Sequence, residues 1–319
     1  MSVSPTYSAP WLVTGAAGFL GSHLVETLLN QGIPVVALDS LLWGDINHLK
    51  PLQHLPGFQL AIADIRDSAA MKTIVASTRP EAIIHLAALH YIPAASADPP
   101  LAIGINVLGT QNLLTAAMSA GVAKFWFAST GDVYAPADDA HREDHPITPF
   151  NVYGLSKLQG EQLIALTARN HPEVAFIIGR LFNLYGTHET NPHILPEILK
   201  QLRTAPDQPL RLGNLFPKRD LVPVTEAARA IVDMVKAATP GVTTANVATG
   251  QARSMHEVIS MLGELRGKPI QVETDPAKVR PVERNHLQAD VTKLKAMIGW
   301  TPHTDLRRGL AELLAAEPI

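Results

Sequence analysis

Tyr153 and Lys157 stand four residues apart at the start of a stretch with helical spacing of apolar residues. Residues at this spacing lie on one face of a helix, one turn from each other. A lysine ammonium beside a tyrosine stabilises the phenolate, so the tyrosine can act as a base near neutral pH. For an isolated pair of this kind, a core tyrosine beside a solvent-facing lysine is a better interpretation than a catalytic pair.

Thr130 shifts the interpretation of this pair towards catalysis. With Ser129 it directly follows a strand-like run at 124–128, at the sheet edge where a nicotinamide would lie. Its hydroxyl could hydrogen-bond the same substrate oxygen that Tyr153 deprotonates. The alternative is a turn residue that caps the loop.

Gly15, Gly18 and Gly21 lie between a short apolar run, 11–13, and a segment, 19–29, whose apolar residues recur at helical spacing. On a strand–turn–helix junction, such glycines allow a tight turn, let phosphates approach the backbone and let the helix pack closely. A dinucleotide's pyrophosphate can bind there. The alternative is a junction that merely needs small residues.

Asp39 ends a second strand-like run, 33–38. A carboxylate at this position accepts hydrogen bonds from both hydroxyls of the adenosine ribose and repels a 2′-phosphate. The segment from Ser40 to Asn47 contains no Arg or Lys that could offset this repulsion. The alternative is an ordinary turn residue after a strand, but glycines and acid together predict a dinucleotide site that prefers NAD to NADP.

Strand and helix patterns alternate as far as residue 180, which predicts an α/β fold with a Rossmann-type, doubly wound parallel sheet. Strands are expected at 11–13, 33–38, 58–62, 82–88, 124–128 and 174–178, and helices at 19–29, 68–78 (capped by Ser68), 101–119 and 152–170. This predicts an NAD-binding domain over residues 1–180.

After Arg180 the prolines cluster and the elements shorten, which predicts a smaller α/β substrate lobe over residues 181–319. Helices are expected at 225–238 and 255–263, with strand-like pieces around Leu210, Ala245 and Ile270. The lobe should cover the C-terminal edge of the sheet, with some segments returning to the first domain.

The composition narrows the function classes. Hydrophobic residues make up 46 %, the formal net charge is −3 from 26 basic and 29 acidic residues, and no basic run occurs. This argues against a nucleic-acid partner. The absence of cysteine excludes disulfides and thiol catalysis and fits a cytoplasmic location. Residues 1–10 resemble a loose tail without signal-peptide features, and no run is long enough to cross a membrane.

The sequence contains 13 histidines, and two pairs of them stand close together in the chain. His141 and His145 are four apart in a loop-like stretch, and His188 and His193 flank Asn191-Pro192. Neither pair has the further ligands that zinc needs, so we predict no metal site. His90 differs, because with Tyr91 it follows a small-residue turn and should point into the substrate cleft.

As a set, these motifs resemble the extended short-chain dehydrogenases/reductases, specifically NAD-dependent sugar-nucleotide epimerases and dehydratases, over residues 10–310. The resemblance implies that Thr130, Tyr153 and Lys157 form the catalytic trio. It implies that these residues bind the cofactor: Gly15, Ala17, Gly18, Phe19, Leu20, Asp39, Asp64, Ile65, Leu86, Ala87, Ala88, Asn106, Tyr153 and Lys157.

The resemblance extends into the second lobe. It implies that Asn183 contacts the nucleotide-sugar diphosphate, that Arg219 and Arg280 bind phosphates and that Glu283 holds the ribose. Two arginines facing a diphosphate make physical sense through charge-assisted hydrogen bonds, although each arginine alone more often forms a surface ion pair. The stretch 289–302 matches the closing helix and turn.

Three positions depart from the family pattern. The family's 4,6-dehydratases carry Asp-Glu after the threonine, whereas this chain has Gly131-Asp132. The usual proton donor to the departing hydroxyl is therefore missing, and Asp132 is either a base at a sugar carbon or a loop acid. Thr187 stands in place of the family's usual proline, and Val282 in place of its usual glycine. Both positions lie in the sugar-nucleotide lobe, so the resemblance does not identify the nucleotide base or the sugar of the substrate.

These observations favour an NAD-dependent sugar-nucleotide epimerase acting at C4 of a UDP-hexose or related UDP-sugar through a 4-keto intermediate. The alternatives are a dehydratase, decarboxylase or reductase that shares the first oxidation, and a non-catalytic NAD-binding protein, which the intact trio disfavours. A homodimer is expected through helices 101–119 and 152–170, unless their apolar stripes are sheet-facing core. The proposed seam residues are Leu108, Leu113, Leu163 and Leu166.

Overall fold

The computed structural model describes residues 9–279 and 284–316, and its centre is a sheet of seven parallel strands. The strand order is β10-β6-β5-β4-β1-β2-β3. The strands are β1 (Trp11–Thr14), β2 (Val35–Asp39), β3 (Phe58–Ile62), β4 (Ala82–His85), β5 (Lys124–Thr130), β6 (Ala175–Leu181) and β10 (Gly241–Val247). The predicted doubly wound parallel sheet is confirmed.

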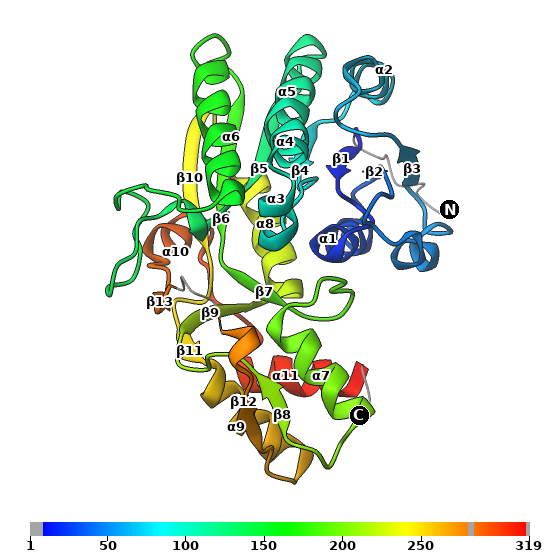
Figure 1. The fold of residues 1–319 in the computed structure, drawn as a ribbon. Helices are drawn as coiled ribbons and strands as arrows, with labels where there is room; N and C mark the ends of the chain where they lie inside the picture. Colours follow the sequence, from blue (N-terminus) through cyan, green and yellow to red (C-terminus); the bar gives the residue numbers. More distant parts are fainter. Residues whose placement is uncertain (1–8, 280–283, 317–319) are drawn as a thin grey trace.

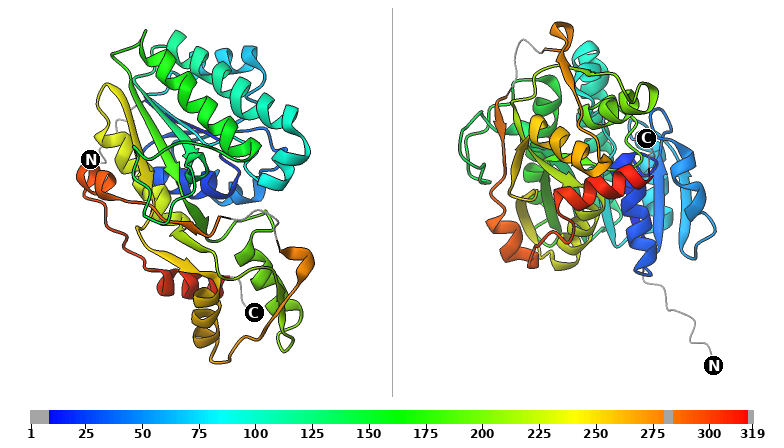
Figure 2. Two further views of the ribbon diagram at one scale, coloured as in Figure 1. Left: turned by 60° about the vertical axis from the view of Figure 1, so that its left-hand side comes forward. Right: turned by 90° about the horizontal axis from the view of Figure 1, so that it is seen from below.

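Helices cover both faces of this sheet, which explains why β1, β2 and β4 are buried along their whole length and lack polar alternation. One face packs against α1 (Phe19–Asn30), α8 (Val224–Ala237) and α10 (Thr292–Ile298), and the other against α2 (Ser68–Thr78), α5 (Thr110–Ser119) and α6 (Val152–Ala168). Figures 1 and 2 show the two helical layers on either side of the strands.

The helix expected at 101–119 is longer and less regular than predicted. It consists of α4 (Pro99–Ile103), a π-helical segment (Gly104–Gly109) and α5. Over Pro99–Ser119 it is long and apolar enough to cross a membrane by length and composition alone, so the expectation that no run reaches that length is wrong. Half of that window is buried inside the protein, as in the core helix of a soluble protein, so this is weak evidence for a membrane.

The cap of α2 also differs from the expectation. Asp67, not Ser68, is the N-cap, because its carboxylate accepts hydrogen bonds from the backbone N–H groups of Ala69 and Ala70, both at 3.0 Å. The helix otherwise has the expected bounds.

A smaller lobe lies beyond the C-terminal edge of the sheet (Figure 1). Its strand β9 (Lys218–Pro223) pairs with β7 (Asn183–Tyr185), β11 (Ala252–Ser254) and β13 (His286–Leu287), and β8 (Leu210–Leu212) pairs with β12 (Val272–Thr274). Helices α7 (Ile194–Thr204), α9 (Met255–Arg266) and α11 (Leu306–Ala316) pack around a separate apolar cluster. Neither α7 nor α11 was expected from the sequence.

The strand-like piece around Ala245 does not belong to this lobe. It is β10, which pairs in parallel with β6 over residues 241–247 and completes the large sheet. Helix α8 packs beside α1 on the same sheet. The chain therefore returns to the large sheet after residue 181, as expected for some segments. The division into an NAD-binding domain over 1–180 and a substrate lobe over 181–319 stays a prediction.

Candidate active site

A cavity of about 1110 Å³ lies between the C-terminal edge of the sheet and the smaller lobe. In open α/β sheets this edge is where ligands bind. A single drug-sized ligand typically occupies ~300–1,000 Å³, so the cavity has room for a dinucleotide together with part of a second ligand. Its walls contain most of the residues singled out from the sequence.

The glycine loop after β1 forms one end of the cavity. Gly15 has φ +71°, and a Cβ there would lie 2.8 Å from the backbone nitrogen of Ala87. A Cβ at Gly21 would lie 2.0 Å from the carbonyl oxygen of Gly15, so Gly21 lets α1 pack against the loop itself. Gly18 is the N-cap of α1 and has no side-chain cap, so backbone N–H groups of the first turn remain available to an anion.

Residues Phe19 and Leu20 line the cavity beside the loop, whereas Ala17 does not. The N–H of Ala17 instead donates to Asp39 Oδ2 at 2.9 Å. Asp39 Oδ1 accepts from the N–H of Leu41 at 2.8 Å, and the side chain is buried at the cavity wall. Asp39 thus fixes the glycine loop, and each of its oxygens keeps a lone pair for a further donor.

The cavity continues past Asp64 and Ile65 and along Leu86, Ala87 and Ala88, as expected for a cofactor path. The Asp64 carboxylate accepts hydrogen bonds from Arg66 Nε at 3.0 Å and Nη2 at 2.5 Å, and these bonds hold the pKa of Asp64 below its usual value. The sequence did not indicate this ion pair.

Asn106 is buried behind the residues that line the cavity, and its assignment to the cofactor site stays a prediction. It sits in the π-helical segment and is buried. Its side chain accepts from the N–H of Leu89 at 2.7 Å and donates to Leu89 O at 3.1 Å and Ser156 Oγ at 2.8 Å. Asn106 therefore joins the loop after β4 to helix α6.

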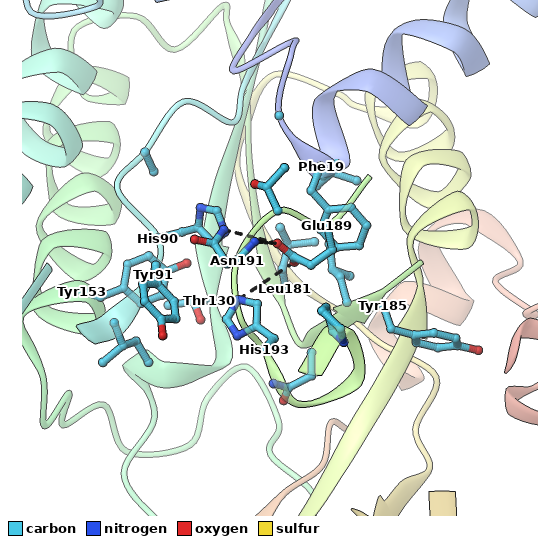
Figure 3. A pocket seen from close by; sticks show the side chains of 18 of the residues that line it. Phe19, His90, Tyr91, Thr130, Tyr153, Leu181, Tyr185, Glu189, Asn191 and His193 are labelled. Atoms are coloured by element: carbon cyan, nitrogen blue, oxygen red, sulfur yellow. Dashed lines mark hydrogen bonds and ion pairs between the residues drawn. The ribbon is translucent and has the colours of Figure 1, made fainter. Parts of the chain in front are cut away.

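Thr130, Asp132, Tyr153 and Lys157 all line the cavity, and the structure brings the predicted trio together. Figure 3 shows the side chains of Thr130 and Tyr153 close to each other, and the Thr130 hydroxyl acts to lower the pKa of Tyr153. Lys157 Nζ lies 6.0 Å from the centre of the Tyr153 ring and 5.0 Å from that of Phe127, which places the ammonium against aromatic faces.

The surroundings of Tyr153 do not favour its phenolate, contrary to the expectation that the Lys157 ammonium stabilises it. Burial, followed by the Asp132 carboxylate, raises the pKa of Tyr153 although the Thr130 hydroxyl acts in the opposite direction. Burial also lowers the pKa of Lys157 to about 7, so part of its stabilising charge is lost near neutral pH. Desolvation of both groups outweighs their proximity.

His90 lies in the cavity as predicted, in the segment between β4 and α3 (Ile92–Ala97). His90 is exposed to the cavity, and the enclosing cleft walls, then the neighbouring His193 and Lys157, lower its pKa. Asn191 Nδ2 lies 3.0 Å from His90 Nε2, and His193 meets the ring of Tyr91 edge-on at 5.6 Å. Figure 3 shows this group beside Thr130 and Tyr153.

Of the two histidine pairs judged from sequence, His188 and His193 belong to different groups in space, whereas His141 and His145 stay in contact. His188 stacks on His23 and His48, with ring centroids 4.8 and 4.2 Å away. His193 lies instead with Glu189 and His90, a grouping across a hundred residues that no local spacing could indicate. His141 stacks on the ring of Tyr134 at 4.9 Å and meets His145 edge-on.

In the smaller lobe, Asn183 and Arg219 line the cavity, whereas Arg280 and Glu283 lie outside the described residues. The sequence reasoning missed Arg284. This buried side chain donates to the carbonyl oxygens of Gly131 at 3.3 Å and Tyr134 at 2.6 Å, and it also lines the cavity. Burial lowers the pKa of Arg284, and the Asp132 carboxylate opposes that effect.

With this geometry established, comparison with known proteins identifies the family. The family model described as GDP-mannose 4,6 dehydratase matches residues 12–313. The chain belongs to this family. It is thus a member of the extended short-chain dehydrogenases/reductases that act on sugar nucleotides, which confirms the resemblance.

Relatives of this family member include enzymes of two reaction types. A UDP-glucose 4-epimerase of Mycolicibacterium smegmatis is 34 % identical over 94 % of this chain and 96 % of that protein. A dTDP-glucose 4,6-dehydratase of Streptomyces griseus is 30 % identical over 95 % and 92 %. A solved structure of UDP-glucuronic acid 4-epimerase from Bacillus cereus, in complex with UDP-glucuronic acid and NAD, is 28 % identical with a TM-score of 0.87, covering 96 % and 98 %.

Gly131 stands where the resemblance implied an aspartate in 4,6-dehydratases. A Cβ at Gly131 would lie 3.3 Å from the ring of Phe182, which is tighter than an ordinary van der Waals contact. An acidic side chain at position 131 would therefore require Phe182 to move. The packing of Phe182 therefore favours glycine at position 131.

Proposed function

We propose that the chain is an NAD-dependent sugar-nucleotide epimerase that inverts C4 of a UDP-hexose or related UDP-sugar. The observation that carries this proposal is the gathering of Thr130, Tyr153 and Lys157 in the same cavity as the glycine loop, with glycine at position 131. The match to a UDP-glucose 4-epimerase, which covers nearly the whole length of both chains, supports it.

NAD fits the residues at the glycine-loop end of the cavity. The absence of side chains at Gly15 and Gly18 leaves room for a pyrophosphate against the first turn of α1, and the Asp39 carboxylate faces the place of the adenosine ribose. Solved relatives in complex with NAD support the same assignment. When bound, NAD accepts a hydride from C4 and returns it.

The chain's own residues then act on the C4 oxygen. Tyr153 takes the hydroxyl proton, and Thr130 donates a hydrogen bond to the same oxygen. The raised pKa of Tyr153 makes it slow to lose its proton unaided but ready to return it, which suits a reaction whose final step re-protonates the sugar. Lys157 contributes positive charge beside the ring, which is needed for the first proton transfer.

A dehydratase is the second candidate, because a 4,6-dehydratase is among the relatives. It would share the first oxidation at C4 and then expel the C6 hydroxyl. Asp132 is the acid of the loop that faces the cavity, but Gly131 leaves the position of the usual proton donor without a side chain. This difference favours epimerisation.

NMR of the reaction with a panel of UDP-, dTDP-, GDP- and CDP-sugars tests the proposal. We expect a UDP-hexose to be converted to its C4 epimer while the nicotinamide absorbance stays unchanged. A dehydrated keto-sugar would replace the proposal with the second candidate. Release of NADH in step with product would indicate a net oxidoreductase.

A homodimer through α4–α5 and α6 is also part of the proposal. Leu108 and Leu166 are 60 % and 56 % exposed, and Leu155 on α6 is 45 % exposed, so these helices present apolar side chains to solvent. Leu113 is fully buried in the sheet-facing core and cannot contribute to the seam, whereas Leu163 is partly buried against the same core and stays a candidate.

Sedimentation velocity at micromolar concentration measures the assembly. We expect a dimer that buries more than ~1,200 Å² and that Leu108→Glu weakens. A single 34.3 kDa species would contradict it.

A further inference from the structure

Three potential metal ligands converge inside the cleft. Among residues 9–279 and 284–316, His90, Glu189 and His193 form the one group of three such side chains whose ligand atoms all lie within 4.8 Å of one another. His90 comes from the segment after β4, and the other two come from the loop between β7 and α7. The group therefore spans the two walls of the cleft, as Figure 3 shows.

The potential ligand atoms of the three side chains lie close together in the cleft. Glu189 Oε1 lies 3.3 Å from Asn191 Nδ2, and a carboxylate can only accept, so the amide nitrogen of Asn191 is correctly placed. That nitrogen also lies 3.0 Å from His90 Nε2, which must then accept and carries its proton on Nδ1. A metal ion at Nε2 would take the lone pair that now accepts from the Asn191 amide.

Glu189 is the anchor of this arrangement. Its side chain is only 7 % exposed, and the Asn191 N–H donates to the same Oε1 at 2.9 Å, which holds the carboxylate in place. Its other oxygen, Oε2, lies 4.0 Å from His193 Nε2. The side chain of His193 is 43 % exposed and can rotate towards the carboxylate.

We propose that His90, Glu189 and His193 bind a divalent transition-metal ion of the zinc class in the cleft. Two imidazoles and one carboxylate are the donor set of open zinc sites, in which water or another oxygen takes the fourth position. Tetrahedral ligands at ~2.0–2.1 Å from zinc lie roughly 3.3 Å apart, so the present separations must shorten by small side-chain rotations. The site revises the prediction of no metal, which weighed only neighbours in sequence.

A bound ion would join the two walls of the cleft. The fourth coordination position faces the cavity, where an oxygen of an entering ligand could occupy it. The Asn191 amide would leave His90 Nε2 when the ion binds, because both cannot share one lone pair. This inference does not rest on the proposed epimerase activity.

Calorimetric titration of the metal-free full-length protein with Zn²⁺, without nucleotide sugar, tests the site. We expect one ion per chain and a higher melting temperature with the ion bound. Co²⁺ in place of Zn²⁺ should give the visible absorption of a site with fewer than six ligands. His193→Gln, Glu189→Gln and His90→Gln should each weaken binding at least ~10-fold, since even loss of an outer hydrogen-bond partner of a metal ligand costs ~10–100-fold.

A matched control is available on the surface. His171 Nδ1 lies 3.4 Å from Glu173, a histidine–carboxylate pair of similar type that is not part of a three-residue group. His171→Gln should leave Zn²⁺ affinity unchanged. Absence of one-to-one binding, or equal affinity in the wild type and the three cleft variants, would overturn the proposal and leave a hydrogen-bonded cluster only.

Folding and cofactor binding of the variants are checked separately. Circular dichroism and NAD titration should match the wild type, because the substitutions are conservative and lie in the open cleft. The metal readout needs no turnover, so a failed epimerase assay would not affect it.

Discussion

The two walls of the cleft are built differently. The wall that carries Thr130, Tyr153 and Lys157 consists of strand β5 and helix α6, and Thr130 and Lys157 are buried there. The opposite wall is the β7–α7 loop, held by hydrogen bonds within the segment and by the stacking of His188. Regular structure fixes reacting groups, whereas loops vary more easily. Variants of the first wall should therefore change kcat, and variants around the smaller lobe should change KM.

Tyr153→Phe should give the largest effect. The change removes the hydroxyl and keeps the ring, so kcat for the UDP-hexose should fall at least ~100-fold while folding and NAD binding survive. Steady-state kinetics with the purified protein measure it. Tyr91→Phe is the matched control, because Tyr91 also lines the cavity and should keep near-native kcat. Near-native turnover by Tyr153→Phe would contradict the assignment of the reacting groups to the β5–α6 wall.

Arg219→Gln should act on the other side of the comparison. Arg219 lines the cavity from β9, and loss of charge-assisted hydrogen bonds to a diphosphate should raise KM roughly 10-fold or more with little change in kcat. Arg211→Gln is the control, because Arg211 is the exposed residue of β8. An effect of Arg219→Gln confined to kcat would contradict the assignment.

Asp39→Asn tests the cofactor end shared by both walls. Removing the negative charge should lower the ratio of the dissociation constants for NADP and NAD by about 10-fold, as expected for the loss of one charge-assisted interaction. Because Asp39 also accepts from Ala17 and Leu41, a modest loss of stability should accompany it. Titration of both cofactors into cofactor-free protein measures this preference. If the wild type bound NADP more tightly than NAD, the role assigned to Asp39 would be wrong.

The smallest expected effect concerns pH. His188 is packed between His23 and His48, and burial, then these two rings, lowers its pKa to about 4 although Asp45 opposes them. Burial also lowers the pKa of His23, against the charge of Glu26. The unfolded chain gains these protons near pH 6.5 and the folded chain only at lower pH, so the free energy of unfolding should fall between pH 6.5 and 4.

His188→Asn isolates this contribution. His188 has φ +69°, a conformation that asparagine tolerates, so the substitution adds little backbone strain. The slope of unfolding free energy against pH should decrease by less than the about 1.4 kcal/mol per pH unit of one full proton, because the ring is partly open to solvent. Urea titrations at several pH values measure the slope, and an unchanged slope would exclude the stack as the source.

Local sequence signals located the first wall and the cofactor loop well. Gly15 needs a positive φ and Gly21 a close helix, both of which leave a recognisable spacing, and the Tyr153–Lys157 spacing follows directly from the helix period. The strands carried enough apolar residues to indicate a buried parallel sheet. These features depend on neighbours within a few residues.

Features that depend on distant parts of the chain were missed. His90 and Glu189 are about a hundred positions apart, and the buried Arg180–Glu161 pair, with Arg180 Nη2 and Glu161 Oε2 2.7 Å apart, joins β6 to α6. The electrostatics of Tyr153 also escaped prediction, because the lysine was visible in the sequence but the burial of both groups was not. Tertiary packing, not propensity, decides such cases.

Strand β10 has a consequence for synthesis of the chain. Until residue 247 has left the ribosome, β6 is an open edge of the sheet, and until α8 docks, apolar side chains of the α1 face have no cover. A nascent chain that ends near residue 180 therefore has an unfinished sheet whose open edge is a template for intermolecular pairing. Truncations designed to isolate the nucleotide-binding half should extend through β10 to stay free of aggregation.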